Sequence, residues 1–220
     1  MLTFGVIALG EKLKEEFPDI DIEFVDKKYI LPLTFILIFF LGHKLAVPNY
    51  NLWVISNVVF YALIPMLVIK LFGWKLKDFG IMYREKAIKY FAIFFILALP
   101  FTIYGSRLAD FRSYYPIFAY SNALDFAFNE LLIGLTMFAT EFFFRGFLLF
   151  ALKDLVGKYA IFIQTIPYTI VHIGKPELEL YYSFFAGIAF GYMDYDSKSI
   201  FPSFLLHYIG SVFFDILCII

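Results

Sequence analysis

The sequence predicts an all-α, polytopic transmembrane helix bundle with about seven spans, within a range of six to eight. Two observations lead to this fold class. Apolar residues make up 62% of the 220 residues and charged residues only 17%, against about 25% in a soluble domain. With a mean hydropathy of +0.80, the chain has too little polar surface to cover a water-soluble globule. The apolar residues also form continuous blocks, which favours membrane helices over the alternating pattern of a β-barrel.

The charge-free blocks approach the roughly 20 residues that a helix needs to cross the hydrocarbon core. The longest has 25 residues between Lys44 and Lys70, and the next has 17 residues between Lys89 and Arg107. The shorter blocks need flanking Lys and Tyr side chains that reach the interface. The predicted spans are 30–47, 52–69, 90–104, 122–152, 159–173, 180–193 and 199–220. The fourth, about 46 Å as one helix, exceeds one perpendicular crossing, so we expect it to be tilted, broken or two elements.

We expect two parts: a charged N-terminal segment, residues 1–29, and a single transmembrane helical domain, residues 30–220. The first is rich in Lys, Asp and Glu, which predicts a cytoplasmic or interfacial position. The loop 70–89 is the most basic, which indicates the cytoplasmic side of a multi-pass protein of the cell membrane, in contact with membrane lipids. The net charge of −1 gives no indication of nucleic acid binding. The single cysteine, Cys218, excludes an intrachain disulfide and a Cys-based metal cluster.

Three spans in the second half carry ionisable residues, which are costly in a membrane and usually mark function. Glu141 and Arg145 are four residues apart in the fourth span and therefore share one helix face. His172 lies in the fifth span and His207 in the seventh. Measured from Lys153, Lys158 and Lys198, which the predicted topology places on one side of the membrane, Glu141 and the two His lie about 18, 21 and 13 Å along their helices. They are therefore expected within about 8 Å of one membrane depth.

Each of these residues alone has a structural explanation. The Glu141–Arg145 pair could stabilise its helix, and a single intramembrane His is often a hydrogen-bonding strut. A purely structural role explains less well why a carboxylate and two imidazoles lie at one depth on three helices. Together they indicate a functional site. Three further acidic residues rank behind them: Asp125, Glu130 and Asp215. A stripe of small residues predicts close helix packing rather than chemistry: Ser183, Gly187 and Gly191.

These residue types fit two kinds of hydrolysis. A carboxylate can take a proton from water and a His can position it, while a second His and a hydroxyl stabilise an oxyanion. Glu with two His is also the ligand set of a catalytic zinc site, so binding of a divalent metal such as zinc is not excluded by the sequence. No cofactor is expected, because Arg145 places a positive charge where the dication would lie. The His-Glu-x-x-His and Gly-x-Ser-x-Gly motifs are both absent, which argues against the common zinc peptidases and serine hydrolases.

At these positions the sequence resembles the CAAX prenyl protease and bacteriocin-processing family of intramembrane endopeptidases, also called the abortive-infection family. The family motifs are Glu-Glu-x-x-x-Arg, Phe-x-x-x-His and His-x-x-x-Asn, in this order on successive helices. Here they read Thr140-Glu141-x-x-x-Arg145, Tyr168-x-x-x-His172 and His207-x-x-x-Ser211. The resemblance covers roughly residues 125–215.

This resemblance implies hydrolysis of a peptide bond in a membrane-associated or lipid-modified substrate, such as a prenylated protein or peptide. It implies water activation by Glu141 with His172, and oxyanion stabilisation by His207 and Ser211. Arg145 would orient Glu141.

The first family Glu is replaced by Thr140 in this chain. Glu141 would then act alone, or Glu177 or Glu179 would take over. The replacement leaves open a catalytically inactive relative that acts as a membrane scaffold or immunity-type binding protein. A small transporter with a proton relay is a further alternative, against which the lack of an internal repeat argues.

Overall fold

The computed structural model describes residues 27–44 and 49–220, and this part of the chain is helical, with no strand. Nearly all of the predicted N-terminal segment 1–29 therefore lies outside the described residues. The elements are α2 (Lys27–Lys44), α3 (Tyr50–Val58), η2 (Val59–Leu63), α4 (Ile64–Leu71), η3 (Leu76–Phe79), α5 (Glu85–Gly105), α6 (Ala109–Tyr114), α7 (Ala123–Glu141), η4 (Phe142–Leu149), α8 (Phe150–Val156), α9 (Tyr159–Ile170), α10 (Glu177–Ser197) and α11 (Phe201–Ile219).

A helical segment occupies each of the seven predicted spans, which confirms the all-α polytopic class. Four described segments are long and apolar enough to cross a membrane: Tyr50–Leu71, Glu85–Gly105, Ala123–Val156 and Phe201–Ile219. A shorter apolar helix covers Ile30–Gly42. With only 12 residues, α9 extends about 18 Å, so it cannot cross the hydrocarbon core alone.

The predicted fourth span is one continuous helical segment of 34 residues, Ala123–Val156. Asn122 caps its start, because its side chain accepts hydrogen bonds from the backbone N–H groups of Leu124 and Asp125. The α-helical hydrogen bonding changes at Phe142, where the π-helical segment η4 begins, and all eight residues of η4 are buried. A π-helical stretch inside an α-helix is frequent at functional sites, and Glu141 immediately precedes this one.

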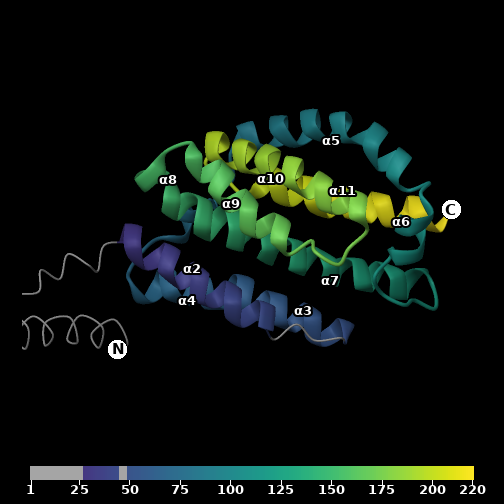
Figure 1. The fold of residues 1–220 in the computed structure, drawn as a ribbon, viewed down its shortest axis with the longest axis horizontal. Coiled ribbons are helices and arrows are strands. Elements are labelled where there is room, and N and C mark those ends of the chain that lie inside the picture. The colour runs from purple at the N-terminus through teal and green to yellow at the C-terminus, as the bar shows by residue number, and fades with distance from the viewer. Residues whose placement is uncertain (1–26, 45–48) are drawn as a thin grey trace, which may run out of the picture.

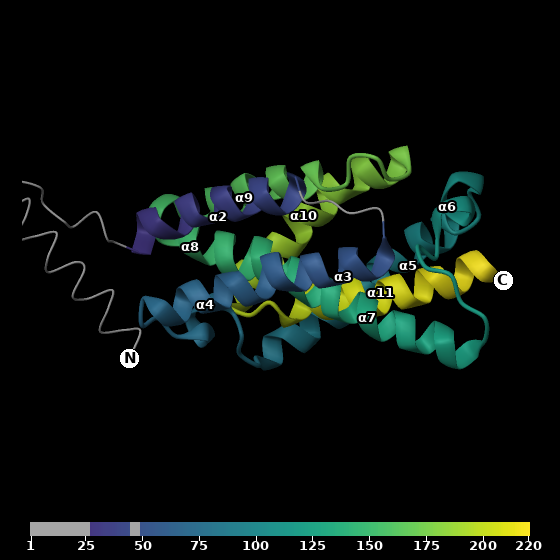
Figure 2. The ribbon, with the colours of Figure 1, turned by 90° about the horizontal axis from the view of Figure 1, so that it is seen from below.

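Figure 1 shows α5 on one side of the bundle and α2 with α3 and α4 on the opposite side. Helices α7, α9, α10 and α11 lie between them, and the C-terminus lies at the same end as α6 (Figures 1 and 2). Extensive contacts join α7 to α3 and α11, and η4 to α2 and α9. The 34-residue segment is therefore the central element, and its residues meet side chains from both sides of the bundle.

Phenylalanine side chains of η4 form the centre of the apolar core. The ring centroid of Phe143 lies 4.4 Å from that of Phe35 on α2 and 4.4 Å from that of Tyr61 on η2. Phe144 packs edge-on against Tyr168 of α9, at 5.6 Å. Large aromatic surfaces in these stacked and edge-on geometries stabilise the packing of α2, η2 and α9 around η4.

The predicted small-residue stripe lies at the contact between α9 and α10. A Cβ atom added to Gly187 would lie 2.8 Å from Thr165 Cγ2, and one added to Gly191 would lie 2.6 Å from Gln164 Nε2. The close approach also lets Gln164 Nε2 donate to the Gly187 carbonyl oxygen at 2.8 Å. Close helix packing is therefore the role of these glycines, as the sequence predicts.

Replacing Gly187 with Ala should lower the stability of the folded protein in detergent by about 1–3 kcal/mol, because the added methyl group overlaps Thr165. Gly210 on α11 provides the matched control, since a Cβ there meets no atom within 4 Å. Gly210→Ala should leave stability unchanged or raise it by up to about 1 kcal/mol through helix propensity. Thermal unfolding followed by circular dichroism measures both, and equal midpoints for the two variants would contradict the packing argument.

Candidate active site

The site is centred on a direct contact between Glu141 and His207. Glu141 ends α7, and His207 lies in the second turn of α11. Their Oε1 and Nδ1 atoms are 2.6 Å apart, and the Glu141 side chain is fully buried. Because the carboxylate accepts, we assign the hydrogen on this ring to Nδ1, which leaves Nε2 as the chemically available nitrogen.

Arg145 forms a buried ion pair with Glu141, and its Nη1 atom also donates a long hydrogen bond of 3.5 Å to Oε1, the oxygen that contacts His207. Its Nη1 atom lies 3.3 Å from Glu141 Oε2, and neither side chain is exposed. The guanidinium carbon also lies 3.8 Å from the ring centroid of Tyr168, a close cation–π contact. The sequence predicted this pair from its i, i+4 spacing, and the structure adds the aromatic ring as a third partner.

Asp194 and Ser203 extend this buried polar cluster, and they were not among the predicted site residues. Ser203 Oγ donates to Asp194 Oδ2 at 2.6 Å, and the Ser203 backbone N–H donates to Asp194 Oδ1 at 3.3 Å. Both residues are fully buried, and Asp194 lies within electrostatic range of Glu141 and Arg145. Ser203 precedes His207 by one turn, but its hydroxyl bonds Asp194. In the sequence, Asp194 directly follows the apolar block 180–193, where an acidic residue is expected simply because the membrane interface is polar. This pattern did not distinguish Asp194 from an ordinary interfacial residue.

His172 lies two residues beyond the end of α9, where the chain leaves the helix. Its Nδ1 atom is 2.8 Å from the Tyr168 carbonyl oxygen, so Nδ1 donates and Nε2 is left as an acceptor. The imidazole also packs edge-on against the Tyr168 ring, at 4.7 Å between centroids. The side chain is thus held in one orientation by the residue that begins its predicted motif.

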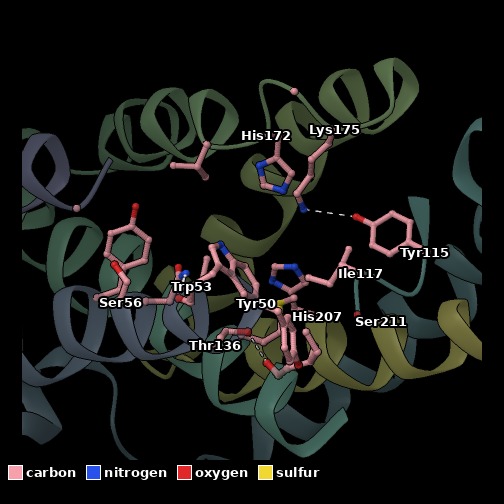
Figure 3. A pocket seen from close by; sticks show the side chains of 18 of the residues that line it. Tyr50, Trp53, Ser56, Tyr115, Ile117, Thr136, His172, Lys175, His207 and Ser211 are labelled. Carbon is pink, nitrogen blue, oxygen red and sulfur yellow. Dashed lines mark hydrogen bonds between the residues drawn. The ribbon is translucent and has the colours of Figure 1, made fainter. Parts of the chain in front are cut away.

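Both histidines line one cavity of about 480 Å³, between α3, α7, α11 and the connection from α9 to α10. Figure 3 shows His172 and Lys175 reaching into it from one side and His207 from the other. The lining residues that matter for the chemistry are Thr140, His172, Lys175, His207, Ser211 and Asp215. Glu141 and Arg145 are not among the lining residues and lie behind His207. Of the two residues at the family's Glu-Glu positions, Thr140 lines the cavity and Glu141 does not.

The two substitute carboxylates suggested by the sequence do not line this cavity. Glu177 is exposed and accepts a hydrogen bond from Tyr181. Glu179 accepts from Lys175 Nζ at 2.8 Å and from the Tyr115 hydroxyl at 2.7 Å. Burial, with Glu179 nearby, raises the pKa of Tyr115 well above its ordinary value, so this phenol stays a donor.

Within residues 27–44 and 49–220, no group of three His, Cys, Asp or Glu side chains is arranged to hold a metal ion. Glu141 Oε1 contacts His207 and accepts from Arg145, and the Arg145 guanidinium also lies 3.3 Å from Oε2, so a positive charge already faces this carboxylate. His172 Nδ1 is likewise occupied by a backbone carbonyl group.

Residues 122–213 match the family described as type II CAAX prenyl endopeptidase, Rce1-like. This confirms the resemblance over the part of the chain that carries Glu141, Arg145, His172, His207 and Ser211. Neither a curated protein nor a solved structure matches the chain. Together with the apolar helices, the match defines a helical membrane protein with a core similar to that of these proteases.

Ser203→Ala should lower stability by about 1–3 kcal/mol, because it removes the side-chain donor of a fully buried carboxylate. Ser211→Ala is the matched control, since Ser211 lines the cavity. We expect its stability to stay within about 0.5 kcal/mol of the unmodified protein. Chemical denaturation in detergent micelles compares the two, and a Ser203→Ala protein as stable as Ser211→Ala would argue against a structural Asp194–Ser203 bond.

Proposed function

We propose that the protein is an intramembrane endopeptidase that hydrolyses a peptide bond in a membrane-associated substrate, by histidine-activated water. The observation that carries this proposal is the convergence of His172 and His207 on one cavity, inside the segment that matches the protease family. The cavity wall is partly aromatic, with Tyr50 and Trp53 on α3, which suits a lipid-modified peptide such as a prenylated one. The proposed location is the cell membrane, with several crossings and surrounding lipid.

His172 is the proposed general base. Its Nε2 atom accepts a proton from water while the water oxygen attacks the peptide carbonyl carbon. When the carbon–nitrogen bond breaks, the same proton passes from His172 to the leaving amine. Glu141 is proposed to act through His207 rather than on water directly, because Glu141 does not line the cavity and contacts His207.

His207 and Ser211 are the proposed oxyanion donors. A protonated His207 would be stabilised by the Glu141 carboxylate, whose Oε1 atom lies 2.6 Å from His207 Nδ1. Its Nε2–H would donate to the oxygen of the tetrahedral intermediate, and the Ser211 hydroxyl lies one turn further along the same cavity wall. Arg145 keeps Glu141 ionised and oriented in this arrangement.

Replacement of either histidine should reduce cleavage of a prenylated reporter peptide in proteoliposomes by about 100-fold or more, because each removes a proton-transfer or oxyanion group. Glu141→Gln should also reduce cleavage strongly, since Gln keeps the shape but cannot balance a protonated His207. Ser113→Ala, on the exposed surface of α6, is the control and should cleave normally.

Full activity of Glu141→Gln would contradict this role of Glu141 and leave the two histidines to act without it. Inactivity of the unmodified protein on both lipidated and plain peptides would favour the non-catalytic scaffold.

We also propose that the reaction needs no metal. The Arg145 guanidinium, 3.3 Å from Glu141, places a positive charge where zinc would bind, which costs affinity in a buried site. Elemental analysis of the purified protein should find well under one zinc per chain, and chelator treatment should leave cleavage unchanged. About one zinc per chain, lost together with activity in His207→Ala, would show a metalloprotease.

A further inference from the structure

We propose that Asp215 and Glu130 form a subsite at one end of the cavity that binds a basic side chain of the peptide substrate. The proposal rests on the proposed function and specifies its substrate: a peptide with a Lys or Arg a few residues from the cleaved bond.

Asp215 is a buried acidic side chain that meets the cavity, with Glu130 as its nearest ionisable neighbour. It lines the cavity, is only 2% exposed, and its Oδ1 atom has no hydrogen-bond partner within the described part of the chain. Glu130, on α7, lies behind it and is 4% exposed. Neither Glu130 oxygen has a hydrogen-bond donor among the described residues. Helices α7 and α11 pack together and bring the two carboxyl groups within reach of each other.

The nearby cation does not satisfy this pair. Lys175 lines the same cavity, but its Nζ atom bonds Glu179 at 2.8 Å and Tyr115 at 3.5 Å. Because Lys175 bonds Glu179, the two neighbouring carboxyl groups Asp215 and Glu130 have no ion pair with a basic side chain among the described residues. Buried polar groups without partners are costly, so a positively charged group that enters the cavity gains the interaction that the chain itself does not supply. The same carboxyl groups disfavour an acidic substrate group at this end.

The helix geometry of α11 also sets the distance between Asp215 and His207, the proposed oxyanion donor. His207, Ser211 and Asp215 follow one another at intervals of four residues and all line the cavity. Eight residues of helix place Asp215 about 12 Å from His207. An extended peptide advances about 3.3 Å per residue, so a Lys or Arg two to four residues from the cleaved bond brings its charged end to Asp215.

Equilibrium binding separates this proposal from catalysis. Fluorescent prenylated peptides carrying Lys, or the uncharged isostere norleucine, at one position are titrated with the unmodified protein in detergent. Fluorescence anisotropy should show at least about tenfold tighter binding of the Lys peptide for one register two to four residues from the scissile bond. This readout does not need cleavage, so an inactive protein with a Lys preference would overturn the proposed function and leave the subsite standing.

Asp215→Asn and Glu130→Gln test the assignment to these residues, with correct folding checked by circular dichroism. Each should reduce the Lys-to-norleucine preference to less than about threefold, because the charge partner is lost. Asp154→Asn, the same change at an exposed residue of α8, should keep the full preference. Equal binding of Lys and norleucine peptides in every register, or a preference that survives both variants, would overturn the proposal.

Discussion

The structure depends on the burial of one carboxylate, Glu141, in the middle of the bundle. A buried carboxylate without partners would be very costly, so the surrounding helices must supply them. Arg145 provides one from the next turn, and His207 provides the other from α11. The ring of Tyr168 on α9 covers the guanidinium group, so three helices meet at one charge. The position of α11 against α7, and with it the position of His207 on the cavity, follows from this requirement.

The polar residues of the candidate site fall into two groups, a fully buried cluster and a set that lines the cavity. Glu141, Arg145, Asp194 and Ser203 are fully buried and hold charge and orientation. His172, His207 and Ser211 border the cavity, which is where the proposed function places water and the peptide. The replacement of the family's first Glu by Thr140 changes the cavity wall, because Thr140 lines the cavity and Glu141 does not. In the proposed mechanism, Glu141 therefore acts from the buried cluster through His207, which it contacts.

Much of the fold and part of the site could be predicted from the sequence. The apolar blocks correspond to helices because a backbone in lipid must satisfy its own hydrogen bonds, and a helix does so locally. Glu141, Arg145 and the two histidines could be chosen as candidate site residues because ionisable groups are costly in spans. Asp194 was missed because its partner Ser203 lies nine residues away on another helix, and only packing brings the two together. The same limit hid the difference between Thr140 and Glu141, which are adjacent in sequence but face different surroundings.

The sequence by itself determined the helical membrane class, the approximate helix boundaries and the identity of the ionisable residues, since each depends on local composition and spacing. Only the tertiary structure decided which of these residues touch, which face the cavity, and which are paired. Hydrogen bonds such as Glu141–His207 join residues 66 positions apart. Their formation depends on how α7 and α11 are rotated about their axes, and this rotation is set by packing across the whole bundle rather than by any local pattern.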